Sequence, residues 1–479
     1  MSVTAPDRDV VVIEQDRRAR GVTPVLAGVG MTVAVMQTLM VPLLPELPSL
    51  LHTSSSAAAW VITVTLLAAA ASTPVLGRLG DMYGKRRVLL AAVAMLIAGS
   101  LLCGFASSLV PMLIGRALQG CSIGTIALGI SIMRDELPAK RLGSSIGLMS
   151  SSLGIGGAFG IPVAALIAEH FDWHTLFFGA AALGAVGFVM VLLMVPESPV
   201  RSGGRFDVAG ALGLSTGLVA LLLAISKGAD WGWGSGLTLG LFAAAALTLV
   251  VWGAVELRVA EPLVNLRTSA RRQVLLTNLA SVMVGFALYA TQLVPIQLLR
   301  LPVETGYGLG QSMLAAGLCI APTGLFMMAA SQLGARLIER SGPKVALLTG
   351  ISVLGMAYLI GLVALYEPWQ LAVFSALAGS GVGLAYAAMP TLIIDAVPSS
   401  ETAAANGLNA LMRSIGTASS AAVIGMVLAH MTTGFGAGTI PSMTGFRVSL
   451  LIACGACALA LLIGVFIPGE HAVHDRKRQ

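Results

Sequence analysis

The stretch GRLGDMYGKRRVLL, residues 77–90, gathers Asp81, Lys85, Arg86 and Arg87 within seven residues. Long apolar segments flank it, in a chain of 479 residues of which only 10% are charged. Soluble domains hold about 25% charged residues. With 56% hydrophobic residues and a mean hydropathy of +0.89, the chain is predicted to be an all-α polytopic membrane protein. The quoted stretch is then a loop between two spans.

The apolar segments predict the number of spans, because a hydrocarbon core of ~30 Å needs about 20 helical residues. Fourteen spans are expected, beginning near residues 24, 57, 88, 110, 145, 175, 208, 237, 274, 313, 345, 371, 405 and 448. If the N-terminus is cytoplasmic, 23 of the 28 Lys and Arg residues fall in cytoplasmic loops and tails. The positive-inside rule therefore predicts that both termini are cytoplasmic. The excess of Arg over Lys, 23 to 5, and the many Ala and Gly residues indicate a bacterial inner (plasma) membrane.

The two halves of the chain repeat one another. The segments 79–85, 117–120 and 135–138 are matched by similar segments 258, 259 and 260 residues later. Such a steady offset indicates a duplicated unit. We therefore predict two six-helix bundles related by a pseudo-two-fold axis, with two inserted helices between them. The expected boundaries are a cytosolic tail 1–22, a first bundle 23–200, an inserted pair 201–260, a second bundle 261–468 and a cytosolic tail 469–479.

Several classes of function are disfavoured by what the sequence lacks. The net charge of +6 comes from basic residues in short loops, so no nucleic-acid partner is expected. The sequence contains no GxxxxGK[ST] phosphate loop, which argues against ATP as the driving force. The histidines form no ligand pattern and the loops are short, so a metal, a cofactor, an enzyme or a receptor is not expected.

Three motifs together resemble the major facilitator superfamily, and within it the fourteen-span drug:proton antiporter group. The quoted loop is similar to the signature between the second and third spans. Arg116, Gln119, Gly120 and Gly124 resemble the fourth-span motif. The segment GIGGAFGIPVAA, residues 154–165, resembles the antiporter motif of the fifth span, although its proline lies one place late and two alanines replace glycines. A hinge is expected there, formed by Gly154, Gly156, Gly157, Gly160 and Pro162.

The resemblance implies that Asp81 closes the cytoplasmic side by meeting the N-terminus of the thirteenth span near Ala403. A helix N-terminus favours a carboxylate. The alternative is a solvated ion pair within the loop. Gly77 and Gly84 are expected to permit a tight turn, and the basic residues to face the cytoplasmic leaflet. The gate motif is thus Gly77, Asp81, Gly84, Lys85, Arg86 and Arg87, with a second-half counterpart at Glu339, Gly342 and Lys344.

Charged residues inside spans are the next candidates. Arg116, with Gln119 one turn away, is assigned to the transport pathway, against the alternative that it reaches the headgroups. Arg413 fits a cavity role and structural hydrogen bonding equally well. No Asp or Glu lies near the middle of a predicted span, so Glu46 and Asp395, at span ends, are the candidates for proton coupling. Both also fit a structural role at the interface.

The cavity walls are expected to include Gln37, Thr38, Gln292, Gln297 and Met389, each of which also fits ordinary helix packing. A cavity with arginines and no acid favours neutral, apolar or weakly anionic cargo.

The function expected from the resemblance is secondary active transport by alternating access. We predict efflux of hydrophobic small molecules, either drugs or secondary metabolites, by a monomer in the lipid bilayer, exchanged for protons and without a cofactor. The alternative is an importer or a lipid transporter of the same fold.

Overall fold

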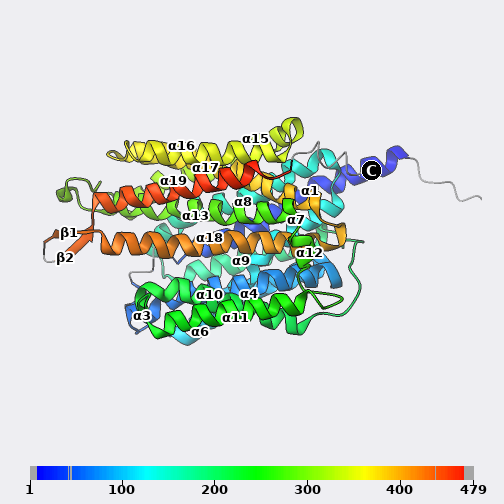
Figure 1. Ribbon diagram of the computed structural model, residues 1–479, viewed down its shortest axis with the longest axis horizontal. Helices are drawn as coiled ribbons and strands as arrows, with labels where there is room; N and C mark the ends of the chain where they lie inside the picture. Colours follow the sequence, from blue (N-terminus) through cyan, green and yellow to red (C-terminus); the bar gives the residue numbers. More distant parts are fainter. Residues whose placement is uncertain (1–7, 41–42, 44–45, 437, 469–479) are drawn as a thin grey trace, which may run out of the picture.

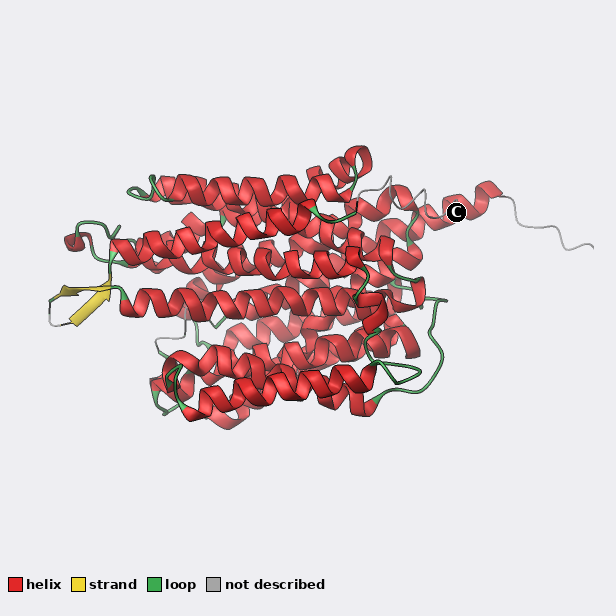
Figure 2. Cartoon of the chain, in the orientation of Figure 1, coloured by secondary structure: helices red, strands yellow, loops and turns green. Residues whose placement is uncertain are grey.

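The computed structural model describes residues 8–40, 43, 46–436 and 438–468. Its helices run side by side along the long axis of the molecule (Figure 1) and are joined mostly by short loops (Figure 2). Among the described residues, thirteen helices are long and apolar enough to cross a membrane. The helix α8 (Ala139–His170) is not one of these thirteen, but it has 32 residues and occupies the position of the expected fifth span. The expected all-α membrane fold is confirmed, and the count of fourteen spans stays a prediction.

In the first half, the prediction that residues 77–90 form a loop is wrong: they are helical on both sides of Gly84, the single residue between the second and third long helices. The elements of the first half are α1 (Arg8–Thr38), α2 (Leu47–Leu50), α3 (Ser55–Ala58), α4 (Trp60–Tyr83), α5 (Lys85–Gly104), α6 (Leu109–Cys121), η1 (Ser122–Gly124), α7 (Thr125–Glu136), α8 and α9 (His174–Met194). The span 109–136 is thus divided by a short 3₁₀ turn. Helix α1 begins inside the segment predicted as a tail, and its membrane-length part is Gly21–Thr38. Residues 1–7 and the predicted tail 469–479 lie outside the described residues.

An inserted helical hairpin and the second half follow. The inserted elements are α10 (Val208–Trp231) and α11 (Gly236–Glu256), and the short α12 (Leu266–Ser269) follows them. The second half comprises α13 (Arg272–Arg300), η2 (Val303–Thr305), α14 (Met313–Ile320), α15 (Pro322–Ser341), α16 (Pro343–Gly361), α17 (Pro368–Ala396), η3 (Ser399–Glu401), α18 (Thr402–His430), β1 (Thr432–Phe435), β2 (Gly438–Pro441) and α19 (Met443–Val465). The two strands pair antiparallel, with Thr432 opposite Pro441.

The two halves meet along two seams of packed helices. Helix α4 packs against α18, and α8 packs against α15. The inserted α10 packs on α11, α4 and α18, at the lower side of Figure 1. Each half has its own apolar core, of which the larger lies in the second half around Tyr358, Phe374 and Met389. Helix α1 begins and α19 ends at one end of the bundle, called the terminal end below, and β1 and β2 lie at the opposite, hairpin end (Figure 1).

Candidate functional site: a carboxylate latch between the halves

Asp81 lies in the last turn of α4, at the terminal end, and is 1% exposed. Its Oδ1 accepts a hydrogen bond from the backbone N–H of Ala403 (3.3 Å), and its Oδ2 accepts one from Ala404 (2.9 Å). Both amides belong to the first turn of α18, where backbone N–H groups have no partner inside the helix. The helix dipole adds a partial positive charge there. We call this contact of Asp81 with Ala403 and Ala404 the latch; it is the contact that the resemblance implied.

A buried lysine holds the Asp81 carboxylate from its own half. Lys85 Nζ lies 3.7 Å from Asp81 Oδ1 and 2.5 Å from Asp135 Oδ2, and its side chain has no exposed surface. The expectation that Lys85 faces the lipid leaflet is therefore wrong: a buried ammonium needs paired carboxylates, and two lie beside it. Arg87, which is 71% exposed in its side chain, does face outward.

Arg134, at the end of α7, makes a second link between the halves beside the latch. Its guanidinium donates to the carbonyls of Val397 (3.2 Å) and Pro398 (3.4 Å) and to the hydroxyl of Thr402, the first residue of α18. Sequence reasoning missed Arg134, although its place one residue before the repeated Asp135 segment was a usable signal.

Close approach of α4 and α18 depends on glycine. A Cβ on Gly77 would lie 2.7 Å from the carbonyl oxygen of Ala403, and one on Gly407 would lie 3.0 Å from that of Thr73. Gly77 is inside α4, so its predicted role in a turn is wrong and its absent side chain serves packing instead. The turn glycine is Gly84, which ends α4 with φ +112°, a conformation that side chains rarely adopt.

The segment between α9 and α10 closes over the latch. The backbone N–H of Ser202 donates to the Asp81 carbonyl (2.7 Å), and the Ser202 hydroxyl accepts from Arg78 (3.2 Å). The Ser198 hydroxyl donates to Asp135 Oδ2. Earlier in the same segment, the Glu197 carboxylate accepts from the Arg86 backbone N–H (3.1 Å) at the start of α5. The connection to the inserted hairpin is therefore part of the site.

The second half repeats the turn of the latch motif but not its carboxylate contact. Gly342 ends α15 with φ +84°, as Gly84 ends α4. Lys344 donates to the carbonyl of Val465 (2.7 Å), and Glu339 is exposed. At this seam the halves are joined by the hydroxyl of Ser331 on α15, which donates to the Gly147 carbonyl of α8.

Arg116 is 1% exposed and lies in the core of the first half, away from headgroups and solvent. Its Nη1 donates to Gln119 Oε1 (2.8 Å) and to the Met36 carbonyl (3.3 Å), and its Nε donates to the Val61 carbonyl (3.3 Å). Gln119 in turn donates to the Ser100 hydroxyl (2.8 Å). The network ties α6 to α1, α4 and α5, so Arg116 organises the bundle in this conformation. The alternative that it reaches the headgroups is excluded by its burial.

Arg413 belongs to a comparable polar network in the second half. Its Nη1 donates to Asn409 Oδ1 (2.5 Å), and its guanidinium stacks over the Tyr386 ring, 5.0 Å from the centroid. The Asn409 amide donates to Asn278 Oδ1 (2.9 Å) and to the Ser281 hydroxyl (2.8 Å). These bonds join α18 to α13, and sequence reasoning missed Asn278, Asn409 and Tyr386.

The glycines predicted to form a hinge in α8 are contact points in this conformation. A Cβ on Gly156 would lie 2.4 Å from Ala34 Cβ, so none fits there without a shift of α1. Gly160 likewise faces the Thr38 hydroxyl, and Gly154 faces Met327 of α15. Gly157 and Pro162 lie in the same unbroken helix. The glycine-rich stretch thus packs against both α1 and α15.

The remaining candidates are spread over the molecule. Met389 has no exposed surface and packs in the core of the second half, so it lines no open cavity in this conformation. Thr38 bonds to the Gly156 carbonyl (3.4 Å), and Gln37, Gln292 and Gln297 are half-buried. Glu46, before α2, and Asp395, near the end of α17, are exposed.

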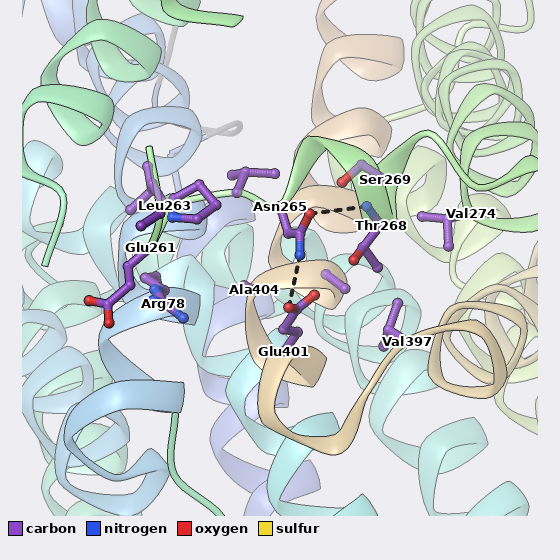
Figure 3. A pocket seen from close by; sticks show the side chains of 14 residues that line it. Arg78, Glu261, Leu263, Asn265, Thr268, Ser269, Val274, Val397, Glu401 and Ala404 are labelled. Atoms are coloured by element: carbon purple, nitrogen blue, oxygen red, sulfur yellow. Dashed lines mark hydrogen bonds between the residues drawn. The ribbon is translucent and has the colours of Figure 1, made fainter. Parts of the chain in front are cut away.

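A surface pocket opens beside the latch at the terminal end (Figure 3). Arg78 and Ala404 line it together with the connection between α11 and α13. There, Asn265 donates to Glu401 (3.0 Å) and accepts from the Thr268 N–H (3.1 Å), as Figure 3 shows. The pocket therefore marks where this connection meets the start of α18.

Two helical halves related by an internal repeat are an architecture found in many secondary transporters. The Major Facilitator Superfamily model matches residues 26–421 and, in a second match, residues 301–479. The chain belongs to this superfamily, whose members transport solutes and are not enzymes.

Similar proteins include multidrug resistance protein Stp of Mycobacterium tuberculosis (strain CDC 1551 / Oshkosh), 27% identical over 86% of this chain and 76% of that protein. The tetracenomycin C resistance and export protein of Streptomyces glaucescens is 28% identical over 83% of this chain and 74% of its own length. Among solved structures, the human organic anion transporter MFSD10 (TETRAN) has a TM-score of 0.66 at 16% identity and covers 93% of this chain and 99% of its own. This likeness supports the fold alone.

Proposed function

We propose that this protein is a secondary active exporter of hydrophobic small molecules, driven by the proton gradient and working by alternating access. The names of two similar proteins, a multidrug resistance protein and a tetracenomycin C resistance and export protein, support export of such compounds. Membership of the superfamily supports a gradient-driven transporter with two moving halves.

The latch is the observation that carries the proposal. Asp81 meets backbone amides of α18 across the seam between the halves, so the contact can break without unfolding either helix. A transporter needs such a contact, because its two global states must differ by interactions that form in one and break in the other. In the proposed cycle the latch closes the cytoplasmic side and releases when that side opens to load cargo.

The proposal also includes the orientation of the protein in the membrane and its location in the cell. We place the terminal end, with its latch and basic loops, in the cytoplasm of a bacterium, and fourteen spans in its plasma membrane. Arg87 and the other exposed basic residues at this end support the placement through the positive-inside rule. The protein acts as a monomer in this scheme.

The cargo class is proposed from two arginines inside the bundle, the buried Arg116 and the half-buried Arg413. Among the described residues, Arg116 and Arg413 donate hydrogen bonds to amide and carbonyl oxygens and to the Met36 sulfur, and to no carboxylate. A strongly cationic cargo would find no opposite charge near them to offset its desolvation. Neutral, apolar or weakly anionic compounds therefore fit, and Glu46 and Asp395 are the proposed proton-coupling acids.

Transport in proteoliposomes across a set pH gradient tests the proposal. We expect uptake of hydrophobic neutral compounds that rises with the gradient and collapses with a protonophore. Accumulation that ignores the gradient would remove proton antiport. Robust transport of quaternary cations that survives Glu46→Gln and Asp395→Asn would overturn the cargo assignment.

A further inference from the structure

Two carboxylates meet where the inserted hairpin begins and ends, at the terminal end of the bundle. Asp207 caps the N-terminus of α10, and its Oδ1 accepts from the Gly210 N–H (2.8 Å). Glu256 is the last residue of α11, and its Oε1 accepts from the Val264 N–H (2.7 Å). In each carboxyl group, one oxygen thus accepts a hydrogen bond from a backbone N–H, and the second oxygen remains to be accounted for.

The two remaining oxygens, Asp207 Oδ2 and Glu256 Oε2, are both buried and have no hydrogen-bond donor among the described residues. They face the same small space, because a Cβ on Gly210 would collide with both. Glu256 is 2% exposed, so bulk water does not solvate its free oxygen. Two ionised carboxylates in this position would lose hydration and repel each other.

We propose that Asp207 and Glu256 form a proton-binding site in which one proton is shared between Asp207 Oδ2 and Glu256 Oε2. The proton turns one group into a hydroxyl donor and leaves the other as its charged acceptor, a short and strong type of hydrogen bond. Both orphaned oxygens then have a partner, and one negative charge replaces two. Coupled carboxyl pairs of this kind titrate as a unit.

The charged groups on the surrounding elements do not neutralise the pair. Arg78 of α4 donates to Ser202, and Arg267 of α12 donates to the Leu257 carbonyl. Glu261 accepts from the Arg205 backbone N–H, and the side chains of Arg205 and Arg258 are exposed. A bound metal ion fits poorly, because two free oxygens fall short of the six or more that hard cations take.

The site is connected to the latch through one short loop. Val264, which donates to Glu256, is followed by Asn265, which donates to Glu401 (3.0 Å), and Glu401 precedes the first turn of α18. Loss of the shared proton would place two negative charges at the base of this loop. The proton therefore holds together the connection between the inserted hairpin and the start of α18.

Infrared difference spectroscopy of the full chain in lipid nanodiscs, titrated with pH, tests this site without any assumption about cargo or direction. The wild type should show the C=O band of a protonated carboxyl at pH values where exposed carboxyl groups are ionised. Glu256→Gln and Asp207→Asn should both abolish it, and Asn retains the acceptor that caps α10. Glu304→Gln, an exposed carboxylate in a loop between spans, is the matched control and should leave the band intact.

A band that is absent from the wild type, or that persists in both variants, would overturn the proposal. The melting temperature of the wild type is a second test that does not depend on the variants folding. Because the folded state keeps a proton that the unfolded state releases at lower pH, stability should fall as pH rises from the range where exposed carboxyl groups ionise to the pH at which the band disappears, and should level off above it. A wild-type melting temperature that stays constant over that range would also overturn it.

Discussion

At the scale of single residues, Asp81 combines three interactions that a neutral side chain cannot reproduce. It accepts from two amides at the start of α18 and lies beside the buried ammonium of Lys85. A carboxylate at a helix N-terminus contributes up to about 2 kcal/mol when partly buried. Because this contact forms in only one of the two proposed conformations, that energy stabilises the closed conformation relative to the open one.

We predict that Asp81→Asn inserts into the membrane normally and loses most of its transport. Asparagine keeps the shape of the side chain but removes its charge. Loss of about 2 kcal/mol of electrostatic stabilisation would shift the equilibrium between closed and open states roughly thirtyfold toward the open state. Initial transport rates at equal protein in proteoliposomes measure this. Glu339→Gln, at the exposed counterpart in the other half, is the matched control and should transport normally. Equal rates for Asp81→Asn and the wild type would remove the latch.

A second prediction concerns Arg116 and distinguishes a structural role in the bundle from a role in the transport pathway. Lysine cannot reproduce a guanidinium fork that reaches Gln119, Met36 and Val61 at once. We expect Arg116→Lys to lower the free energy of unfolding by about 2 kcal/mol or more, since hydrogen bonds to a charged group are lost in the interior. Thermal unfolding in detergent measures it, with exposed Arg340→Lys as control. Unchanged melting with lost transport would favour a role in the pathway alone.

At the scale of elements, the seam between α4 and α18 depends on small residues. A methyl group on Gly77 would lie 2.7 Å from the Ala403 carbonyl oxygen, which belongs to rigid helical backbone. We expect Gly77→Ala to separate the helices and to reduce transport several-fold, because overpacking costs about 1–3 kcal/mol. Gly240→Ala is the control, since nothing lies within 4 Å of its Cβ position. Comparable transport rates for Gly77→Ala and Gly240→Ala would show that the close approach of α4 and α18 at Gly77 is not needed for transport.

The packing of α8 on α1 can be tested with one substitution that destabilises the contact and a second that restores part of the lost stability. A Cβ on Gly160 would collide with the Thr38 hydroxyl, so Gly160→Ala should lower the melting temperature. Adding Thr38→Ala removes that hydroxyl and should restore part of the loss, as residues in direct contact are not additive. Additive losses in the double variant would show that another contact limits the approach of α1 to α8.

At the scale of the whole molecule, the sequence predicted those features that follow from a regular pattern of residues. Hydropathy, the repeat and the loop motif led to the two-half helical fold, and the family resemblance implied the contact of Asp81 with the helix start near Ala403. Contacts that depend on tertiary packing were not predictable. Lys85 was expected at the leaflet because basic loop residues face lipid headgroups, yet Asp135 draws it inside. No motif distinguishes Asn278 and Asn409 in one sequence, and the only signal for Arg134 was its place beside the repeated Asp135 segment.

We infer that Asp81 holds the two halves closed at the terminal end. The distance distribution between spin labels at Tyr83, where α4 ends, and Ser399, just before α18, tests this most directly; both side chains are exposed. In nanodiscs, we expect a dominant short distance between the labels in the wild type and a new, longer population in Asp81→Asn. Identical distributions in the two proteins would contradict it.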